Sequence, residues 1–348
     1  MSAVLPLPGV RAPSSGGVWG AAWKRFKSDK VGLVSLGIVG AFLVLVIAAG
    51  LGLVAGQWQR EIGVPNAPPT LLGPAAKTES AAIAAPKGPN VDISDVDPLA
   101  PRYKEWEERA ATYKTVDTVK RETLPFGGDR LGRDVLAKAI KGAEISIMVG
   151  VLAAVVATLI GTVLGAIGGF FGGKAGDFLE WLYNVFTSIP GILLIFAFAA
   201  VAGRGVQSVV LILGLTGWTG IYRLVRAEFI KHSVREYVRA AEAIGASTFS
   251  RMFRHILPNV SHVALVQLSI HVVGFIKAEV ILSYLGLGVA VDQVSWGTML
   301  AEAQSELILG HWWQLATATL FMAVFVTAFS LMADALRDAL DPKLRGLE

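Results

Sequence analysis

Two sets of residues in this sequence have the types needed for phosphate binding or catalysis. The first is Gly168-x-x-x-x-Gly173-Lys174-Ala175, which nearly matches a phosphate-binding P-loop. That motif needs a preceding strand, a following soluble helix and a Ser or Thr hydroxyl that holds magnesium. Here a long apolar run precedes the glycines and Ala175 has no hydroxyl. We therefore expect no ATP binding in this chain and interpret Lys174 as an anchor at a membrane surface.

The histidines are the second set. They are His232, His255, His262, His271 and His311. His262 and His271 share one segment but not the spacing of metal ligands on a helix face. The chain has no cysteine, which excludes disulfides and thiolate sites, and it has neither HExxH nor GxSxG. We therefore expect no catalytic residue, no metal site and no cofactor.

Residues 234–259 form a polar segment between long apolar runs. Its charged residues are Arg235, Glu236, Arg239, Glu242, Arg251 and Arg254. These charges are costly in a bilayer core, so the segment lies outside it. The composition predicts a short helix from Glu236 to Ile244, ended by Gly245. A second helix from about Ser247 to Ile256 follows, and Pro258 is expected to end it.

The second predicted helix has one apolar face, made by Phe249, Met252, Phe253 and Ile256. Two short helices at a membrane surface with exposed apolar side chains suit docking into a groove on a soluble partner. The alternative is a plain connecting loop with a surface-lying helix. Periodicity alone leaves both interpretations open.

Long apolar runs make this an all-α integral membrane protein, because 53% of its 348 residues are hydrophobic. The expected spans are residues 31–55, 145–171, 178–202, 206–224, 260–285 and 314–332. The predicted organisation is an N-terminal tail (1–30), a first span (31–56), an insert with an interfacial helix (57–143), a core with spans two to six (144–333) and a C-terminal tail (334–348).

Basic residues in the short segments set the orientation. On one side they are Lys24, Arg25, Lys27, Lys30, Lys174, Arg223, Arg226, Arg337, Lys343 and Arg345. The other side has only Arg204. The positive-inside rule therefore places both termini in the cytoplasm and the long insert outside.

The insert, residues 57–125, has low hydrophobicity and no apolar run. A charged helix is expected from Tyr103 to Tyr113, and an amphipathic helix at the outer interface from Asp134 to Ile140. The insert is either a small lid or docking surface or a variable insertion, and the second interpretation is favoured because the segment buries little core. Residues 1–22 are expected to be a disordered tail.

Two of the spans contain glycine or proline at informative positions. In span two a glycine recurs every fourth residue, at Gly161, Gly165, Gly169 and Gly173, which predicts a close helix–helix seam between spans or at a dimer. Pro190 predicts a kink in span three, with Thr187 or Ser188 bonding the freed carbonyl. Glu180 is expected to snorkel or to pair with Lys174.

Charged and aromatic residues mark span five and the segment after it. Lys277 and Glu279 either reach headgroup water or line an outer gate. The segment 286–313, which includes Trp296, is expected outside, and the paired Trp312 and Trp313 are expected in an interfacial aromatic belt.

The segment at 234–259 resembles the EAA loop of ABC importer permeases. Ala240, Ala241, Gly245, Leu257 and Pro258 match its pattern, while Arg239 replaces a Glu and His255 an Ile. The sequence Arg254-His-Ile-Leu-Pro-Asn259 is similar to that of the branch that imports dipeptides, oligopeptides and nickel. The same branch resembles this chain at Gly128, Asp129, Gly132, Arg133, Asp134 and Ser146, in the phrase from Glu279 to Gly288, and in the closing segment from Asp334.

The resemblance covers about residues 20–56 and 125–345, and it implies residue roles. The residues expected to contact an ATPase are Glu236, Arg239, Ala240, Ala241, Gly245, Ala246, His255, Leu257 and Pro258. Those expected at the translocation pathway or gate are Pro190, Asn184 and Glu279. Trp181 and Asn184 stand where members often have Arg and Asp, so the lining is less charged.

The resemblance also implies partners: a second permease subunit, two ABC ATPase subunits, an extracytoplasmic substrate-binding protein and the lipid of a bacterial inner membrane, with no nucleic acid. Alternating access would move di- or oligopeptides, or else nickel, opines or peptide-like antibiotics. A secondary transporter is the rival class, but inverted repeats and mid-span ionisable clusters are not evident. A membrane scaffold or intramembrane hydrolase is a third class, for which no nucleophile–base arrangement is found.

Overall fold

The computed structural model describes residues 18–74, 97–112 and 120–340, and it separates into two compact units. The larger unit combines the chain up to Trp58 with the chain from Ala137 onward, and the smaller is Gln59–Leu136. Within the described residues there are helices and a few isolated bridges but no extended strand. The predicted all-α class is confirmed.

Among the described residues, five helical segments are long and apolar enough to cross a membrane, and a bent pair makes a sixth if it is counted as one span. The spans are α2 (Lys30–Gly50), α4 (Val135–Phe171), α7 with α8 (Val206–Thr216 and Trp218–Ser233), α10 through α11 (Thr248–Tyr284) and α13 (Trp313–Leu340). The bent pair is α5 (Gly173–Thr187) with α6 (Gly191–Ala202). Six spans were predicted, and their order agrees with this arrangement.

Two expected short helices are continuous with spans. The interfacial helix predicted at 134–140 is the first part of α4, and the tail helix predicted from Asp334 is the last part of α13, which reaches Leu340. Both segments are rich in Ala and Leu, so nothing in their local sequence ends the helix where the apolar run ends. The expected stop at Pro342 lies outside the described residues.

Pro258 does not end a helix, contrary to the prediction. It lies in the first turn of α11 (Leu257–Tyr284), where its missing N–H has no intrahelical partner to lose. Preceding it are α10 (Thr248–Ser250) and a π-helical segment, η2 (Arg251–Ile256). The chain therefore passes from the polar segment into span five without a break.

Pro190 ends a helix rather than kinking one. α5 stops at Thr187, α6 starts at Gly191, and their axes differ by 85°. Proline disfavours the helical conformation of the residue before it, which explains the complete break. Hydroxyls at the break bond carbonyls of the last turns of α5, since Thr187 Oγ1 donates to the Tyr183 carbonyl at 3.0 Å and Ser188 Oγ to the Val185 carbonyl at 2.8 Å. Neither is the Phe186 carbonyl, four residues before Pro190, for which the prediction was made.

The glycine ridge of α4 is a seam against α8. A Cβ added at Gly161, Gly165 or Gly169 would approach α8 atoms within 2.6–2.8 Å, closer than real Cβ contacts allow. The predicted ridge is therefore confirmed at three positions as packing between spans of one chain. Gly173 is different, since a Cβ added there would meet no atom within 4 Å, and its φ is +45°.

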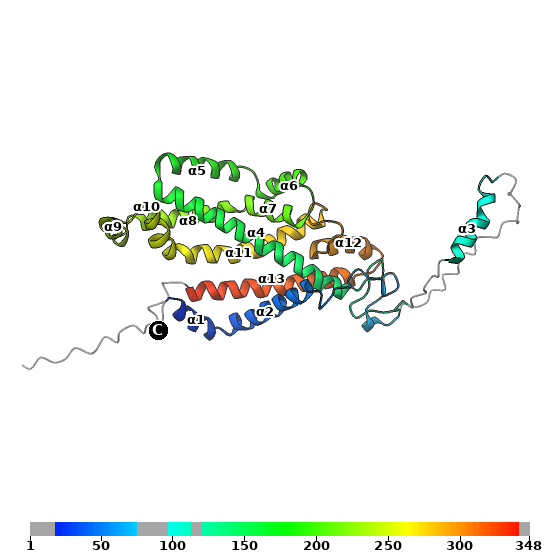
Figure 1. Ribbon diagram of the computed structural model, residues 1–348. Coiled ribbons are helices and arrows are strands. Elements are labelled where there is room, and N and C mark those ends of the chain that lie inside the picture. Colours follow the sequence, from blue (N-terminus) through cyan, green and yellow to red (C-terminus); the bar gives the residue numbers. More distant parts are fainter. Residues whose placement is uncertain (1–17, 75–96, 113–119, 341–348) are drawn as a thin grey trace, which may run out of the picture. The chain divides into compact units, whose positions relative to one another are not determined.

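The helices of the larger unit gather at two opposite ends (Figure 1). α1 (Val18–Ser28), α9 (Glu236–Ala243) and the last turns of α13 lie at one end, which we name the loop end, and α12 (Trp296–Ile308) lies at the other. At the loop end, Phe26 of α1 packs against Ala335 and Ala339 of α13. Residues 18–22 are thus helical, contrary to the predicted tail; residues 1–17 lie outside the described part.

The smaller unit is organised by backbone bridges and a buried carboxylate. Asp129 is fully buried and accepts hydrogen bonds from the N–H groups of Leu131 and Arg133, each at 2.9 Å. Gly132 has φ +78°, and a Cβ added to it would lie 2.1 Å from the Gly63 carbonyl oxygen. The unit also has η1 (Thr70–Leu72) and α3 (Ala100–Thr112), which confirms the charged helix predicted there up to Tyr113, itself outside the described residues.

Candidate coupling loop and translocation pathway

The coupling candidate is built around α9, which forms as predicted and ends before Gly245. Gly245 has φ +85°, a conformation that glycine adopts without strain and that reverses the chain at the helix end. Ser247 then caps α10 by accepting the Ser250 N–H. The glycine and the serine together turn the chain from α9 back toward the bundle.

The predicted ATPase-contacting residues divide between two faces. Ala241 is buried at 3% exposure beside Val238, so this face of α9 packs against its own chain. The outward residues are Glu236, Arg239, Ala240, Gly245 and Pro258, all exposed or partly exposed. Ala246, His255 and Leu257 are half-buried. The outward group is what a soluble partner can reach.

A hydrophobic cluster fixes α9 to three other helices. Val238 of α9 packs with Met252 and Ile256 of η2, Phe229 of α8 and Ala166 of α4. The predicted apolar face of the second helix is therefore turned mainly inward. Phe249 is the exception: it is 70% exposed and borders a groove of about 460 Å³.

Arg251 was named in the sequence only as one of the charges of the polar segment, yet it joins three elements. Its guanidinium pairs with Glu242 of α9 at 2.5 Å and lies over the ring of Phe170 of α4, 5.5 Å from the centroid. The side chain itself belongs to η2, a π-helical turn of the kind often found at functional sites. Because the partners are separated by a glycine turn, helical spacing gives no signal for this pair.

A second polar contact holds the start of α9. Tyr237 Oη lies 2.8 Å from Nδ1 of His232, near the end of α8. Partial burial raises the pKa of the Tyr237 hydroxyl, which keeps it protonated and able to take part in this hydrogen bond. α9 is therefore attached at both of its ends.

The predicted pathway residues on span three are turned away from the rest of the chain. Asn184 and Pro190 are exposed, and Trp181 is 60% exposed. Glu180 pairs with Arg226 of α8 at 3.3 Å, so the expected pairing with Lys174 is wrong. The reason is that Arg226 lies on α8, which packs beside α5, whereas Lys174 is one and a half turns away on the same helix.

Glu279 is fully buried in a junction of three helices. Its carboxylate accepts the hydroxyls of Ser146 of α4 and Ser283 of α11, each at 2.7 Å, and Ser146 Oγ in turn accepts the Trp296 N–H at 3.2 Å. Neither expected place for Glu279, in headgroup water or lining an outer gate, is therefore right, because the neighbouring helices enclose it completely. Lys277, on the same helix, is exposed.

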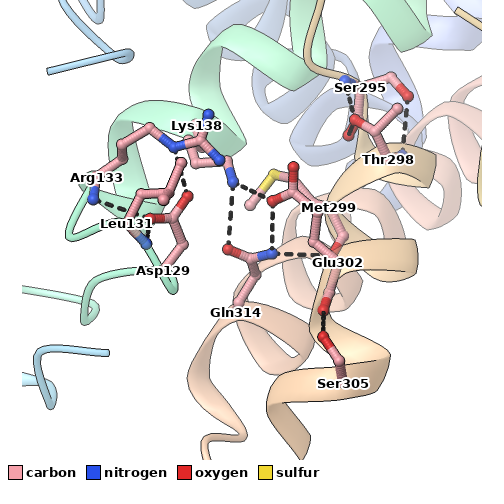
Figure 2. A network of polar contacts seen from close by, with 10 residues as sticks. All are labelled: Asp129, Leu131, Arg133, Lys138, Ser295, Thr298, Met299, Glu302, Ser305 and Gln314. Atoms are coloured by element: carbon pink, nitrogen blue, oxygen red, sulfur yellow. Dashed lines mark hydrogen bonds and ion pairs between the residues drawn. The ribbon is translucent and has the colours of Figure 1, made fainter. Parts of the chain in front are cut away.

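A second polar network joins α4, α12 and α13 (Figure 2). Lys138 of α4 is completely buried, forms an ion pair with Glu302 of α12 and donates to Gln314 Oε1 of α13 at 3.4 Å. Gln314 Nε2 donates to Glu302 at 3.1 Å and to the Met299 carbonyl at 3.1 Å. Sequence analysis missed this network because its members come from three separate helices.

The aromatic residues near α12 are mostly buried. Trp296 is fully buried and donates its Nε1–H to the Ala139 carbonyl at 3.1 Å, while Trp313 is 6% exposed. The place in an interfacial belt expected for Trp313 is therefore wrong, since it is packed inside the unit. Trp312, 49% exposed, remains available to an interface. Two buried polar networks and a buried indole thus fasten α12 to α4, α11 and α13.

Comparison with known proteins identifies the family. Residues 157–346 match the binding-protein-dependent transport system inner membrane component, and residues 17–69 match the N-terminal TM domain of oligopeptide transport permease C. The chain is 37% identical over 220 residues to the dipeptide transport system permease protein DppC of Bacillus subtilis, covering 63% of this chain and 69% of that protein.

A second relative extends over nearly the whole chain. The glutathione transport system permease protein GsiD of Salmonella typhimurium is 31% identical over 344 residues, covering 98% of this chain and 95% of that protein. A solved structure of the MetNI methionine ABC transporter in an inward-facing conformation aligns with a TM-score of 0.49 and 15% identity, over 59% of this chain and 96% of that one. The chain belongs to the binding-protein-dependent inner-membrane permeases of ABC importers, in the dipeptide and oligopeptide branch.

Proposed function

We propose that this chain forms one half of the translocation pore of an importer for di- or oligopeptides. A second permease completes the pore, two ABC ATPase subunits dock at the loop end, and a substrate-binding protein delivers the peptide at the α12 end. Both termini are then cytoplasmic. The peptide substrate rests on the names of the relatives, among them a dipeptide permease and a glutathione permease, glutathione itself being a peptide.

The observation that carries the proposal is the construction of α9. One face of this short helix is packed onto α4, α8 and η2, while the opposite face exposes Arg239 and Ala240 to solvent. A helix with this division is suited to receive a displacement from a docked partner and pass it to the spans that it contacts.

The mechanism follows from these contacts. When the two ATPase subunits close around ATP, they move α9, and the cluster around Val238 together with Arg251 moves the ends of α4 and α11. The α5–α6 pair presents Asn184 and Pro190 away from its own chain, where the second permease would face it, and we assign these residues to the pathway. Glu279 acts from behind the pathway by holding α4 and α11 together at the gate.

The test is uptake by the whole importer reconstituted in liposomes, with the binding protein and ATP supplied. A dipeptide, a longer peptide, glutathione and nickel are offered in parallel. Accumulation of at least one peptide that requires both ATP and the binding protein is expected. ATP-dependent accumulation of nickel alone would overturn the peptide assignment, and accumulation driven by an ion gradient without ATP would overturn the importer mechanism.

A further inference from the structure

α2 and α13 leave an open apolar groove along one side of their contact, with a volume of about 620 Å³. Its floor is formed by the nearly inaccessible Ser35 and Ala328, and its rims include the exposed Val34 and Leu331. The volume lies within the range of roughly 300–1,000 Å³ that is typical of small-molecule sites. This groove plays no part in the contacts of the coupling loop or in either buried network.

The environment of the groove decides what can fill it. α2 and α13 are both long and apolar enough to cross a membrane, so the groove faces hydrocarbon. Its lining is Lys30, Val31, Val34, Ser35, Ile38, Ala323, Val324, Thr327, Ala328 and Leu331. An acyl chain matches this lining along its length, and among these lining residues the charge lies at one end.

That charged end is Lys30, the first residue of α2 and an exposed cation at the mouth of the groove. The basic helix α1 is held at the same end, because Phe26 packs against Leu36 of α2 and Ala335 of α13. Among the described residues of α1, α2 and the end of α13, the cations are Lys24, Arg25, Lys27, Lys30 and Arg337, and the acids are Asp29, Asp334 and Asp338. Asp29 is already engaged in capping α2 through the Val31 N–H at 2.9 Å. Cations therefore outnumber acids where a lipid headgroup would lie.

We propose that this groove is a binding site for an acidic phospholipid of the bilayer, with an acyl chain between α2 and α13 and the phosphate against Lys30. The charge complementarity at the mouth favours a lipid over a span of another subunit, since such a span would have to shield or neutralise Lys30. Clusters of Lys and Arg beside a membrane helix select anionic headgroups by this means. The site fixes the first span to the last at the end where α1 enters.

The test measures the lipid that stays with the purified importer complex. The complex in mild detergent is exposed to phosphatidylglycerol or phosphatidylcholine vesicles, and bound lipid is counted by native mass spectrometry. Lys30→Gln should lower retained phosphatidylglycerol about fivefold and leave phosphatidylcholine unchanged, in line with the contribution of one lysine near a headgroup. Thr327→Phe, which fills the groove from its lining, should lower both lipids.

Lys277→Gln is the matched control, because Lys277 is an exposed lysine on another span, and it should change neither count. Equal retention of the two lipids by the unmodified complex, or an equal loss in Lys277→Gln, would overturn the proposal. A photo-crosslinker placed at Val34 separates the two possible occupants. An adduct with lipid is expected, whereas an adduct with a permease subunit would assign the groove to a protein contact and overturn the lipid site.

Discussion

Arg251 illustrates how a single side chain can tie the docking helix to the spans. Its ion pair with Glu242 is partly exposed, since the Glu242 side chain is 60% accessible, so the pair contributes little to stability. The pair connects elements, because the same guanidinium also lies over the ring of Phe170 of α4. In the proposed mechanism the pair therefore serves the transmission of motion more than folding.

We predict that Arg251→Glu and Glu242→Arg each lower ATP-driven uptake by roughly tenfold, a coupling effect of ordinary size. ATP hydrolysis by the complex should fall less than uptake, because the ATPase still turns over while α9 no longer moves the spans. The double reversal restores the opposite charges and should recover most of the uptake. Uptake and hydrolysis are measured in the same liposomes. A double variant no better than either single variant would show that the ion pair is not what matters.

Lys138 belongs to a buried network in which removal of one partner is costly. Glu302→Gln would remove a carboxylate that pairs with the fully buried ammonium, and we expect a loss of up to about 3–5 kcal/mol in the free energy of unfolding. The double variant Lys138→Met/Glu302→Met should be more stable than Glu302→Gln alone, because the buried ammonium is removed together with the carboxylate. Unfolding in detergent measures both. Lys277→Met, at an exposed lysine, is the control and should change stability little; a similar loss there would contradict the role of burial.

At the scale of elements, the glycine seam of α4 fixes how closely α8 approaches. A Cβ at Gly165 would lie 2.8 Å from the Tyr222 carbonyl oxygen, whereas a Cβ at Gly274 of α11 would meet nothing within 4 Å. The two glycines occupy spans of the same chain and differ in the space around them. They therefore form a matched pair for substitution.

We predict that Gly165→Ala destabilises the protein by about 1–3 kcal/mol, the usual cost of overpacking. Gly274→Ala should be neutral or slightly stabilising, because alanine is the better helix former by about 1 kcal/mol. The melting temperatures of the two purified variants, each compared with the unmodified protein, measure these two effects. Equal melting temperatures would contradict the seam between α4 and α8.

Local sequence was a good guide to some elements and a poor guide to others. α9 and its end at Gly245 follow from composition and from one glycine, so they were predictable. The helix end predicted at Pro258 was wrong, because proline is excluded from helix interiors but accepted in a first turn. The local sequence does not determine which turn of a helix the proline occupies. The partners Lys138 and Glu302 are 164 residues apart, so only the packing of three helices brings them together. The family resemblance supplied the coupling loop but gave no sign of Arg251.

At the scale of the whole larger unit, α4 connects the two ends. Near its start, Lys138 pairs with Glu302 of α12, and near its end Phe170 lies under the Arg251 guanidinium. Its 37 residues span about 55 Å at the helical rise. Figure 1 shows it crossing the bundle between these ends. At one end it is fastened by buried polar networks, and at the other it contacts the cluster that holds α9. A rigid helix anchored in this way can carry a displacement at α9 to the α12 end.

The central claim, that an ATPase docks on α9, is tested most directly by co-purification from gently solubilised membranes. We predict that the tagged chain retains a second permease and an active ATPase, and that Ala240→Glu, on the exposed face of α9, loses the ATPase but keeps the second permease. Val291→Glu, at an exposed residue preceding α12, is the control and should keep both. A chain that carries no ATPase, or an Ala240→Glu variant that retains full ATPase activity, would contradict the account.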